Sequence, residues 1–181
     1  MTDVRAEVLE IYPEINEIAD EGLRDATLGV YEKALAAGGW QASDLHRIPF
    51  TLLIKGGTNV TFPEHVRTVA RMCIAMCDLM SDAYGDRMNL NRDHLIAGAF
   101  LADVGKLIEF EEVGGEVVKG HKGDMLRHPF QGVGLCYEEG IPQEVMHIIA
   151  VHSKEGDHVA RTPEALIFHH ADFADFEVLG G

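Results

Sequence analysis

An amphipathic helix that starts near residue 61 is the feature that most constrains the fold of this chain. Thr61 and Glu64 have the spacing of a capping box, and Pro63 suits the first turn of a helix. Apolar residues then recur at helical spacing: Val66, Val69, Ala70, Cys73, Ile74, Cys77 and Met80. Such a stripe predicts a long helix with one face buried in a hydrophobic core.

Most of the remaining chain shows the same helical periodicity. Further helices are predicted over residues 13–37, 91–105, 124–139, 142–151 and 162–178. Between Ile108 and Lys119 the pattern changes to short β-type runs on either side of Gly114 and Gly115, which predicts a β-hairpin.

These elements predict an all-α fold, a helical bundle with one small β-hairpin insertion. No catalytic pattern occurs in the first third of the chain. We therefore expect residues 1–60 to form an N-terminal helical extension packed on a core of residues 61–181, in a single compact domain. A chain of 181 residues is long enough to bury roughly 70% of its unfolded surface without disulfides.

The charge of the chain narrows its possible partners. Its 30 acidic and 15 basic residues give a net charge of −15, and no cluster of Lys or Arg occurs. Phosphate backbones require a basic stripe, so nucleic acid is not an expected partner. A small-molecule substrate that is anionic stays possible, because a bound divalent ion supplies positive charge locally.

Two further observations concern the location of the chain. No apolar run reaches the roughly 18 to 20 residues of a membrane span, and the polar, acidic start differs from a signal peptide. We therefore expect a cytoplasmic protein with no membrane partner. Cys73 and Cys77, four residues apart on one helix face, are interpreted as buried apolar residues of a reducing compartment. The sequence indicates no oligomeric state.

Two carboxylates stand in apolar surroundings. Asp103 follows Phe100, Leu101 and Ala102, and Asp172 is flanked by apolar residues. A carboxylate in such a place needs a metal ion or an ion pair. A hydrolytic metal site also needs imidazoles that converge from different helices, and the chain has 10 histidines.

The order of these residues resembles the HD superfamily of helical metal-dependent hydrolases. The His-Asp pair that names this family ends a helix inside a string such as A-x-L-x-H-D-x-G-K, and the eight residues from Ala99 are A-F-L-A-D-V-G-K. His65, which precedes V-x-x-V-A, matches the first histidine of the family. Asp172 matches its late Ala-Asp. The resemblance covers about residues 61–176.

Two later histidines extend the resemblance. His128 stands in an H-P-x-x-G element similar to that of HD proteins that hold two metals, and His152 resembles their second late histidine. The resemblance implies that His65, Asp103 and Asp172 bind one ion. It also implies that His128 and His152 hold a second ion through a bridging Asp103, or contact a substrate phosphate.

The implied activity is hydrolysis by metal-activated water, most often of a small phosphoester or nucleotide-type metabolite. Mixed imidazole and carboxylate ligands suit divalent Mn, Fe, Co, Ni or Zn, as one ion or two. The implied catalytic residues are Asp103, Lys106, His128 and His152. Lys106 either pairs with Asp103, meets an anionic substrate, or is a solvated lysine at a helix end. Two alternative functions stay open: a metal-dependent hydrolase or lyase of a non-phosphorylated metabolite, and a non-catalytic ligand-binding protein.

One departure from the family pattern puts the activity in doubt, because Ala102 stands where the histidine of the pair is expected. The chain is then an engineered variant, a natural member with another ligand, or a natural member with weakened or lost catalysis. A single change in an otherwise intact site favours the first. His94 lies about 12 Å away along the helix and cannot substitute, whereas His121 and His169 are better placed. The other histidines are expected to be structural: His46, His147, His158 and His170.

Overall fold

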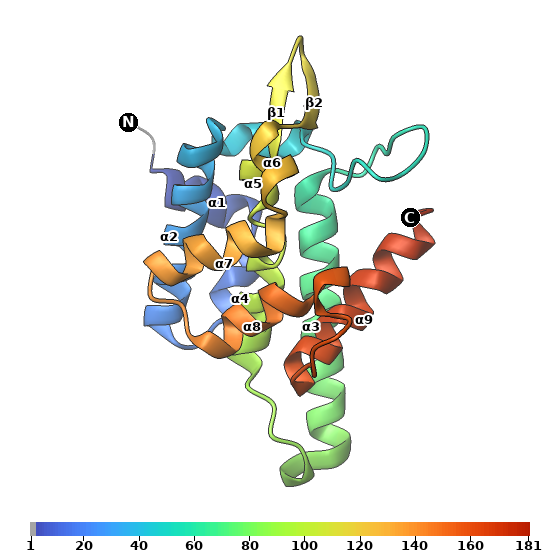
Figure 1. The fold of residues 1–181 in the computed structure, drawn as a ribbon. Coiled ribbons are helices and arrows are strands. Elements are labelled where there is room, and N and C mark those ends of the chain that lie inside the picture. The colour runs from blue at the N-terminus through green and yellow to red at the C-terminus, as the bar shows by residue number, and fades with distance from the viewer. Residues whose placement is uncertain (1–2) are drawn as a thin grey trace.

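The structure is a computed structural model that describes residues 3–181, a bundle of helices with one β-hairpin (Figure 1). The first half contains α1 (Val4–Ile11), η1 (Pro13–Glu17), α2 (Glu21–Gly38), η2 (Ala42–Arg47), α3 (Phe62–Tyr84) and η3 (Gly85–Arg87), where η marks a short 3₁₀ helix. The second half contains α4 (Arg92–Leu101), α5 (Lys106–Glu109), β1 (Phe110–Val113), β2 (Glu116–Lys119), α6 (His121–Met125), α7 (His128–Glu138), α8 (Gln143–Val151), η4 (Lys154–Gly156) and α9 (Pro163–Val178). The prediction of an all-α fold with one small antiparallel hairpin is confirmed.

Helix α3 begins with the predicted capping box. The Thr61 hydroxyl accepts a hydrogen bond from the Glu64 backbone N–H (3.4 Å), and the Glu64 carboxylate accepts one from the Thr61 backbone N–H (2.8 Å). Helices α4 and α9 pack against α3. Cys73 and Cys77 are free and buried, which confirms their interpretation as core residues.

The predicted continuous helix over 13–37 is wrong. The chain forms α1, which was not predicted, and then separates η1 from α2. The Asp93 carboxylate accepts hydrogen bonds from the backbone N–H groups of Ala19 (3.0 Å) and Asp20 (2.8 Å). Asp20 in turn caps α2 by accepting from the Leu23 N–H (3.0 Å). This interruption depends on a contact with α4, which local periodicity does not report.

The N-terminal segment packs on the later helices through buried hydrogen bonds. The Tyr31 hydroxyl donates to the Phe100 carbonyl (2.7 Å), and the Trp40 indole N–H donates to the Leu107 carbonyl (2.8 Å). Buried apolar side chains from α1 to α9 form one continuous core. These contacts join the N-terminal segment to α4, α5 and the common core. The division of the chain at residue 60 stays a prediction.

Two more predicted helices are shorter than expected. The helix over 91–105 ends at Leu101, and a turn separates it from α5. The helix over 124–139 is split into α6 and α7. Pro129 has no backbone N–H and suits only the first turn of a helix, so a new helix starts at His128.

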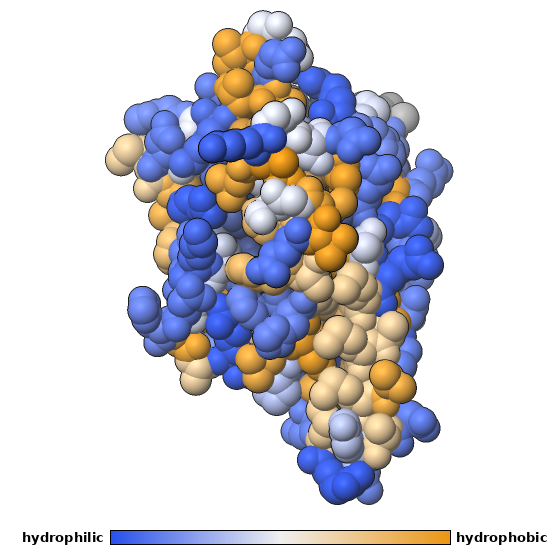
Figure 2. Space-filling view, turned by 90° about the vertical axis from the view of Figure 1, so that its right-hand side faces the viewer, coloured by the Kyte–Doolittle hydropathy of each residue, from blue (hydrophilic) through white to orange (hydrophobic). Residues whose placement is uncertain are grey.

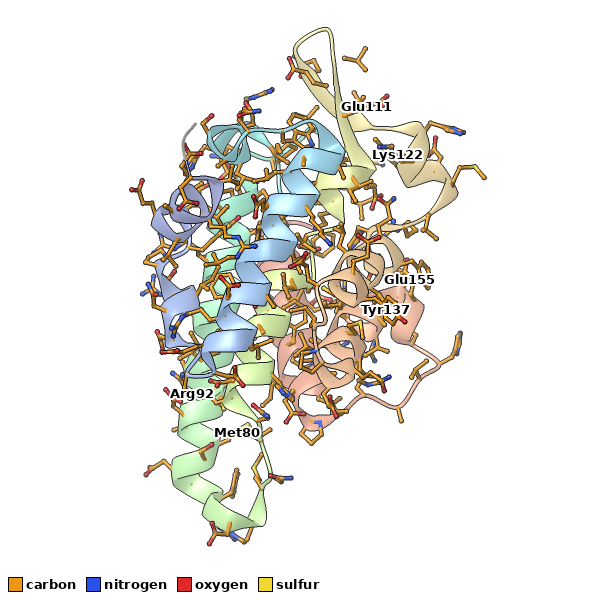
Figure 3. The ribbon with its side chains drawn as sticks, turned by 90° about the vertical axis from the view of Figure 1, so that its left-hand side faces the viewer. Met80, Arg92, Glu111, Lys122, Tyr137 and Glu155 are labelled. Atoms are coloured by element: carbon orange, nitrogen blue, oxygen red, sulfur yellow. The ribbon has the colours of Figure 1, made fainter. Side chains whose placement is uncertain are left out.

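Surface contacts hold the lower part of the bundle together. Arg92 at the start of α4 binds Asp78 on α3 (2.9 Å) and Glu17 on η1 (2.6 Å), and Figure 3 shows it beside α3, near Met80. Figure 2 shows hydrophilic and apolar residues mixed over the face that carries α9, with a pale orange patch just above the hydrophilic lower tip, where α3 extends. No helix among residues 3–181 is long and apolar enough to cross a membrane.

Candidate metal centre

The turn between α4 and α5 places Asp103 at the centre of the site. Asp103 is 5% exposed. Gly105 makes this position possible, because a Cβ atom there would lie 2.1 Å from the His128 carbonyl oxygen. The close approach of this turn to the start of α7 brings the Asp103 carboxylate next to the His128 ring.

One oxygen of Asp103 faces a first group of ligand atoms, which we call the α3–α9 group: His65, Asp103 and Asp172. The His65 Nε2 atom lies 3.3 Å from Asp103 Oδ2 and 3.1 Å from Asp172 Oδ1. His65 comes from the first turn of α3 and Asp172 from α9. The three ligand atoms all lie within 4.8 Å of one another.

The other oxygen of Asp103 faces a second group, which we call the α7–α8 group: Asp103, His128 and His152. Asp103 Oδ1 lies 3.4 Å from His128 Nε2 and 3.7 Å from His152 Nε2. The two imidazole Nε2 atoms are 3.2 Å apart. His128 is the first residue of α7 and His152 follows the last residue of α8. The two groups together contain all five predicted metal ligands.

Each of the three histidines is fixed through its outer ring nitrogen. His65 Nδ1 lies 2.7 Å from Asp175 Oδ2, His128 Nδ1 lies 2.9 Å from Glu109 Oε2, and His152 Nδ1 lies 2.7 Å from the Ile149 carbonyl oxygen. A carbonyl oxygen only accepts, and so does an ionised carboxylate, so these partners assign the Nδ1 proton. A ring that carries its proton on Nδ1 alone directs a bare Nε2 lone pair into the site, as metal-bound histidines do.

The facing Nε2 atoms of His128 and His152 show whether the residues of the α7–α8 group suit a metal ion. Two lone pairs at 3.2 Å repel unless a proton or a cation lies between them and the nearby Asp103 oxygen. Two imidazoles and one carboxylate are a set of ligands that suits a divalent transition metal. The residues present therefore fit an ion at the α7–α8 group.

Charge dominates the α3–α9 group. Burial acts to lower the pKa of His65, but hydrogen bonds with Asp103, Asp172 and Asp175 outweigh burial and raise this pKa to about 10. Burial acts to raise the pKa of Asp103, but the neighbouring Lys106 and His65 hold it well below its usual value. An ion bound at His65 Nε2 must therefore displace a proton.

The His128 environment differs. Burial lowers the pKa of this imidazole, although the hydrogen bond with Glu109 opposes the change. Burial acts to raise the pKa of Glu109, but the bonds from His128 outweigh burial and lower that pKa. His128 is thus neutral and Glu109 ionised near neutral pH, which is the state that a ligating histidine needs.

Lys106 is partly buried and paired. Its Nζ donates to Asp103 Oδ2 and to the Phe50 carbonyl oxygen, both at 2.8 Å, and its side chain is only 12% exposed. Of the alternatives for this residue, pairing with Asp103 is the one observed, and the solvated helix-end lysine is not.

The histidines proposed as substitutes at position 102 lie outside both groups. His121 is exposed on α6, where it lines a separate pocket. His169 Nδ1 lies 2.8 Å from the His152 carbonyl oxygen, to which it donates. Ala102 itself has no exposed surface and belongs to the hydrophobic core. Its N–H donates to the Gly98 carbonyl at 2.8 Å, which extends the hydrogen-bond pattern of α4 by one residue.

The other histidines take no part in either group. His94 is half-buried near the start of α4. Of the four expected to be structural, three are exposed and His147 is half-buried; the exposed ones are His46, His158 and His170.

Two positioning residues were not predicted. Asp175 lies three residues after Asp172, so helical spacing alone places both on neighbouring positions of one face. Glu109 accepts from both the backbone N–H (2.9 Å) and the ring of His128, nineteen residues further along the chain. No local pattern connects Glu109 with His128.

A cavity of about 440 Å³ opens over the two groups. This volume lies in the range of about 300 to 1,000 Å³ that is usual for small-molecule sites. Three basic side chains line it: Lys106, Arg127 and Lys154. Three phenylalanines also line it: Phe50, Phe173 and Phe176.

The chain is similar in sequence to a curated protein whose name describes a hydrolytic reaction. This relative is the dihydroneopterin 2′,3′-cyclic phosphate phosphodiesterase of Methanocaldococcus jannaschii, 33% identical over 118 residues. The aligned part is 64% of this chain and 46% of the relative, so the chain spans about half the length of that protein. No protein-family model matches the chain, and no solved structure matches it.

Proposed function

We propose that this chain is a divalent-metal-dependent hydrolase of the HD superfamily that acts on a small phosphoester. The observation that carries the proposal is the pair of ligand groups that share Asp103, with every histidine fixed through Nδ1. The order of these residues in the sequence and the similarity to a phosphodiesterase support the same conclusion.

The balance of buried charge supports a bound cation. Four carboxylates contact the centre directly or through a histidine: Asp103, Asp172, Asp175 and Glu109. Lys106 and, in the metal-free state, protonated His65 are the cations that contact Asp103. Buried charges require compensation, so one or two ions of Mn, Fe, Co, Ni or Zn fit this site better than water alone. Asp103 would be a ligand common to an ion in either group.

The basic lining of the cavity supports an anionic substrate. The chain as a whole has a net charge of −15, yet three basic side chains gather at this one cavity, beside the carboxylates of Asp103 and Asp172: Lys106, Arg127 and Lys154. Arg127 Nε lies 3.3 Å from Glu155 Oε1, and Lys154 is exposed. Such side chains bind phosphate oxygens by charge-assisted hydrogen bonds.

The residues of the site have different roles in the proposed hydrolysis. When bound, a divalent ion lowers the pKa of water and offsets negative charge on a phosphoryl group. Asp103, His128 and His152 would hold that ion, and Glu109 fixes the His128 ring through Nδ1. Lys106 uses two of its three N–H donors on Asp103 and Phe50, so the third is available to a substrate oxygen.

The test is a metal-reconstitution assay. Protein stripped with a chelator is loaded with each candidate ion and incubated with adenosine 2′,3′-cyclic phosphate, and the monoester product is measured. We expect hydrolysis that depends on added metal. His152→Ala and Asp172→Asn should each reduce hydrolytic activity by more than the roughly 10- to 100-fold that loss of an outer hydrogen-bond partner costs.

His158→Ala is the matched control, because His158 is exposed and outside both groups. Bound metal with no hydrolysis of any phosphoester contradicts the phosphohydrolase assignment and favours a non-phosphorylated substrate. Absence of metal binding contradicts the proposal as a whole and favours a non-catalytic protein.

A further inference from the structure

The cavity over the candidate metal centre has an aromatic side for which the proposed hydrolysis has no need. Phe173 and Phe176 of α9 line this side, together with Phe50 from the loop before α3. Phe50 is buried, whereas both α9 phenylalanines are only half-buried. Both α9 phenylalanines line the cavity, and Gly181, which also lines it, lies next to the Phe176 ring.

The order of residues in α9 ties this aromatic side to the metal centre. Asp172 is followed by Phe173, and Asp175 is followed by Phe176. Both aspartates contact His65, at 3.1 Å and 2.7 Å. Residues three apart are neighbours on a helix surface, so the two rings stand in a column beside the column of carboxylates.

The aromatic surface continues to a candidate metal ligand. The rings of Phe176 and Phe50 meet edge to face with centroids 6.2 Å apart, and the Phe50 and His65 centroids are 4.6 Å apart. On the far side of the column, the Phe173 ring packs on His169 at 4.4 Å. A group attached to a phosphoryl unit at His65 thus lies within reach of an aromatic surface.

We propose that Phe173 and Phe176 determine the substrate class by stacking on a flat, uncharged heteroaromatic ring attached to the phosphoester. This inference rests on the proposed function. Aromatic rings favour stacked and edge-to-face contacts, which add affinity beyond the burial of area. Arg127 and Lys154 also line the cavity and attract the phosphate, so the phenylalanines are left for the uncharged part of the substrate.

The experiment compares two ligands that differ only in the ring. Adenosine 2′-monophosphate and methyl β-ribofuranoside 2-phosphate share the sugar and the phosphate, and only the first has a heteroaromatic ring. Binding of each to the Mn²⁺-loaded full chain is measured by calorimetry. Stacking on aromatic side chains predicts tighter binding of the adenosine compound by about 5- to 150-fold.

Variants of the α9 phenylalanines test whether their rings cause the difference in affinity between the two ligands. Phe173→Ala and Phe176→Ala should each reduce the difference several-fold and leave binding of the methyl riboside unchanged. Phe173→Leu keeps an apolar side chain but should also lose the difference, whereas Phe173→Tyr should keep it. Phe130→Ala is the matched control, because Phe130 is 49% exposed on α7 and lines a different pocket.

The result separates this inference from the proposed function. Equal binding of both ligands by the wild-type chain, or a difference that survives both alanine variants, overturns the inference. Hydrolysis of the two corresponding 2′,3′-cyclic phosphates with equal kcat/KM also overturns it while the proposed function stands. A ring-dependent difference in binding, lost in the α9 variants but without hydrolysis of either compound, supports the inference and contradicts the proposed function.

Discussion

Substitution of Glu109 gives the sharpest test of whether a neighbouring carboxylate orients the candidate metal ligand His128. Its Oε2 atom accepts from the backbone N–H and from Nδ1 of His128, each at 2.9 Å, and the residue is 4% exposed. Glu109→Ala frees the His128 ring to rotate. Loss of such an outer partner costs about 10- to 100-fold in metal affinity, or about 1.4 to 2.7 kcal/mol.

The same substitution has a cost in stability. Two buried donors of His128 lose their acceptor, and an unsatisfied buried donor costs about 1 to 3 kcal/mol. A chain of this size shifts its melting temperature by about 2 to 4 °C per kcal/mol. Glu109→Ala is therefore expected to lower the Tm of the metal-free protein by at least about 2 °C.

Glu109→Gln separates orientation from charge. Its amide oxygen still accepts both bonds, so metal affinity should fall less than in Glu109→Ala. Affinity is measured by competition with a chromophoric chelator, and Tm by calorimetry. Glu111→Ala is the control, because Glu111 is an exposed acidic residue on β1 of the same hairpin end (Figure 3). Unchanged metal affinity in Glu109→Ala would refute the orienting role.

Three further predictions concern the frame of the site. Ala102→His should lower Tm and leave metal affinity unchanged, because Ala102 is fully buried in the core and overpacking costs about 1 to 3 kcal/mol. Tighter metal binding at an unchanged Tm would contradict this, because it would show that the new imidazole reaches the ion. Gly105→Ala should lower both Tm and metal affinity, since its Cβ would lie 2.1 Å from the His128 carbonyl oxygen, and wild-type values of both would contradict that contact. The unfolding free energy of metal-stripped protein should fall as pH rises from 6.5 to about 10. The folded-state pKa of His65 is raised to about 10, so the proton that stabilises the folded state is lost across that window. Urea denaturation at several pH values should show a smaller fall in unfolding free energy for His65→Gln.

Local patterns were sufficient for much of the fold. The capping box at Thr61 and the apolar stripe after it correctly predict α3, and the run that contains Gly114 correctly predicts the hairpin. These signals depend on neighbours in sequence. The interruption before α2 depends instead on Asp93, more than seventy residues away, which bonds the backbone of Ala19 and Asp20.

The site also contains some residues that local sequence motifs predict and others that they do not. The five candidate ligands follow from ordered motifs, and the structure brings them into two groups that share Asp103. Glu109 has no motif, because its role arises only when α5 and α7 approach each other at Gly105. Phe173 and Phe176 resemble core residues in the sequence, and only their exposure to the cavity separates them from the core.

The shared carboxylate gives the most direct test of the account. Metal content of the purified, reconstituted chain is measured by elemental analysis for wild type, Asp103→Asn and the control Asp82→Asn, whose aspartate is exposed on α3. The account predicts one or two divalent ions per chain in wild type and in the control, and none in Asp103→Asn, because both groups lose their common ligand. Equal metal content in Asp103→Asn and wild type would contradict a centre built on Asp103.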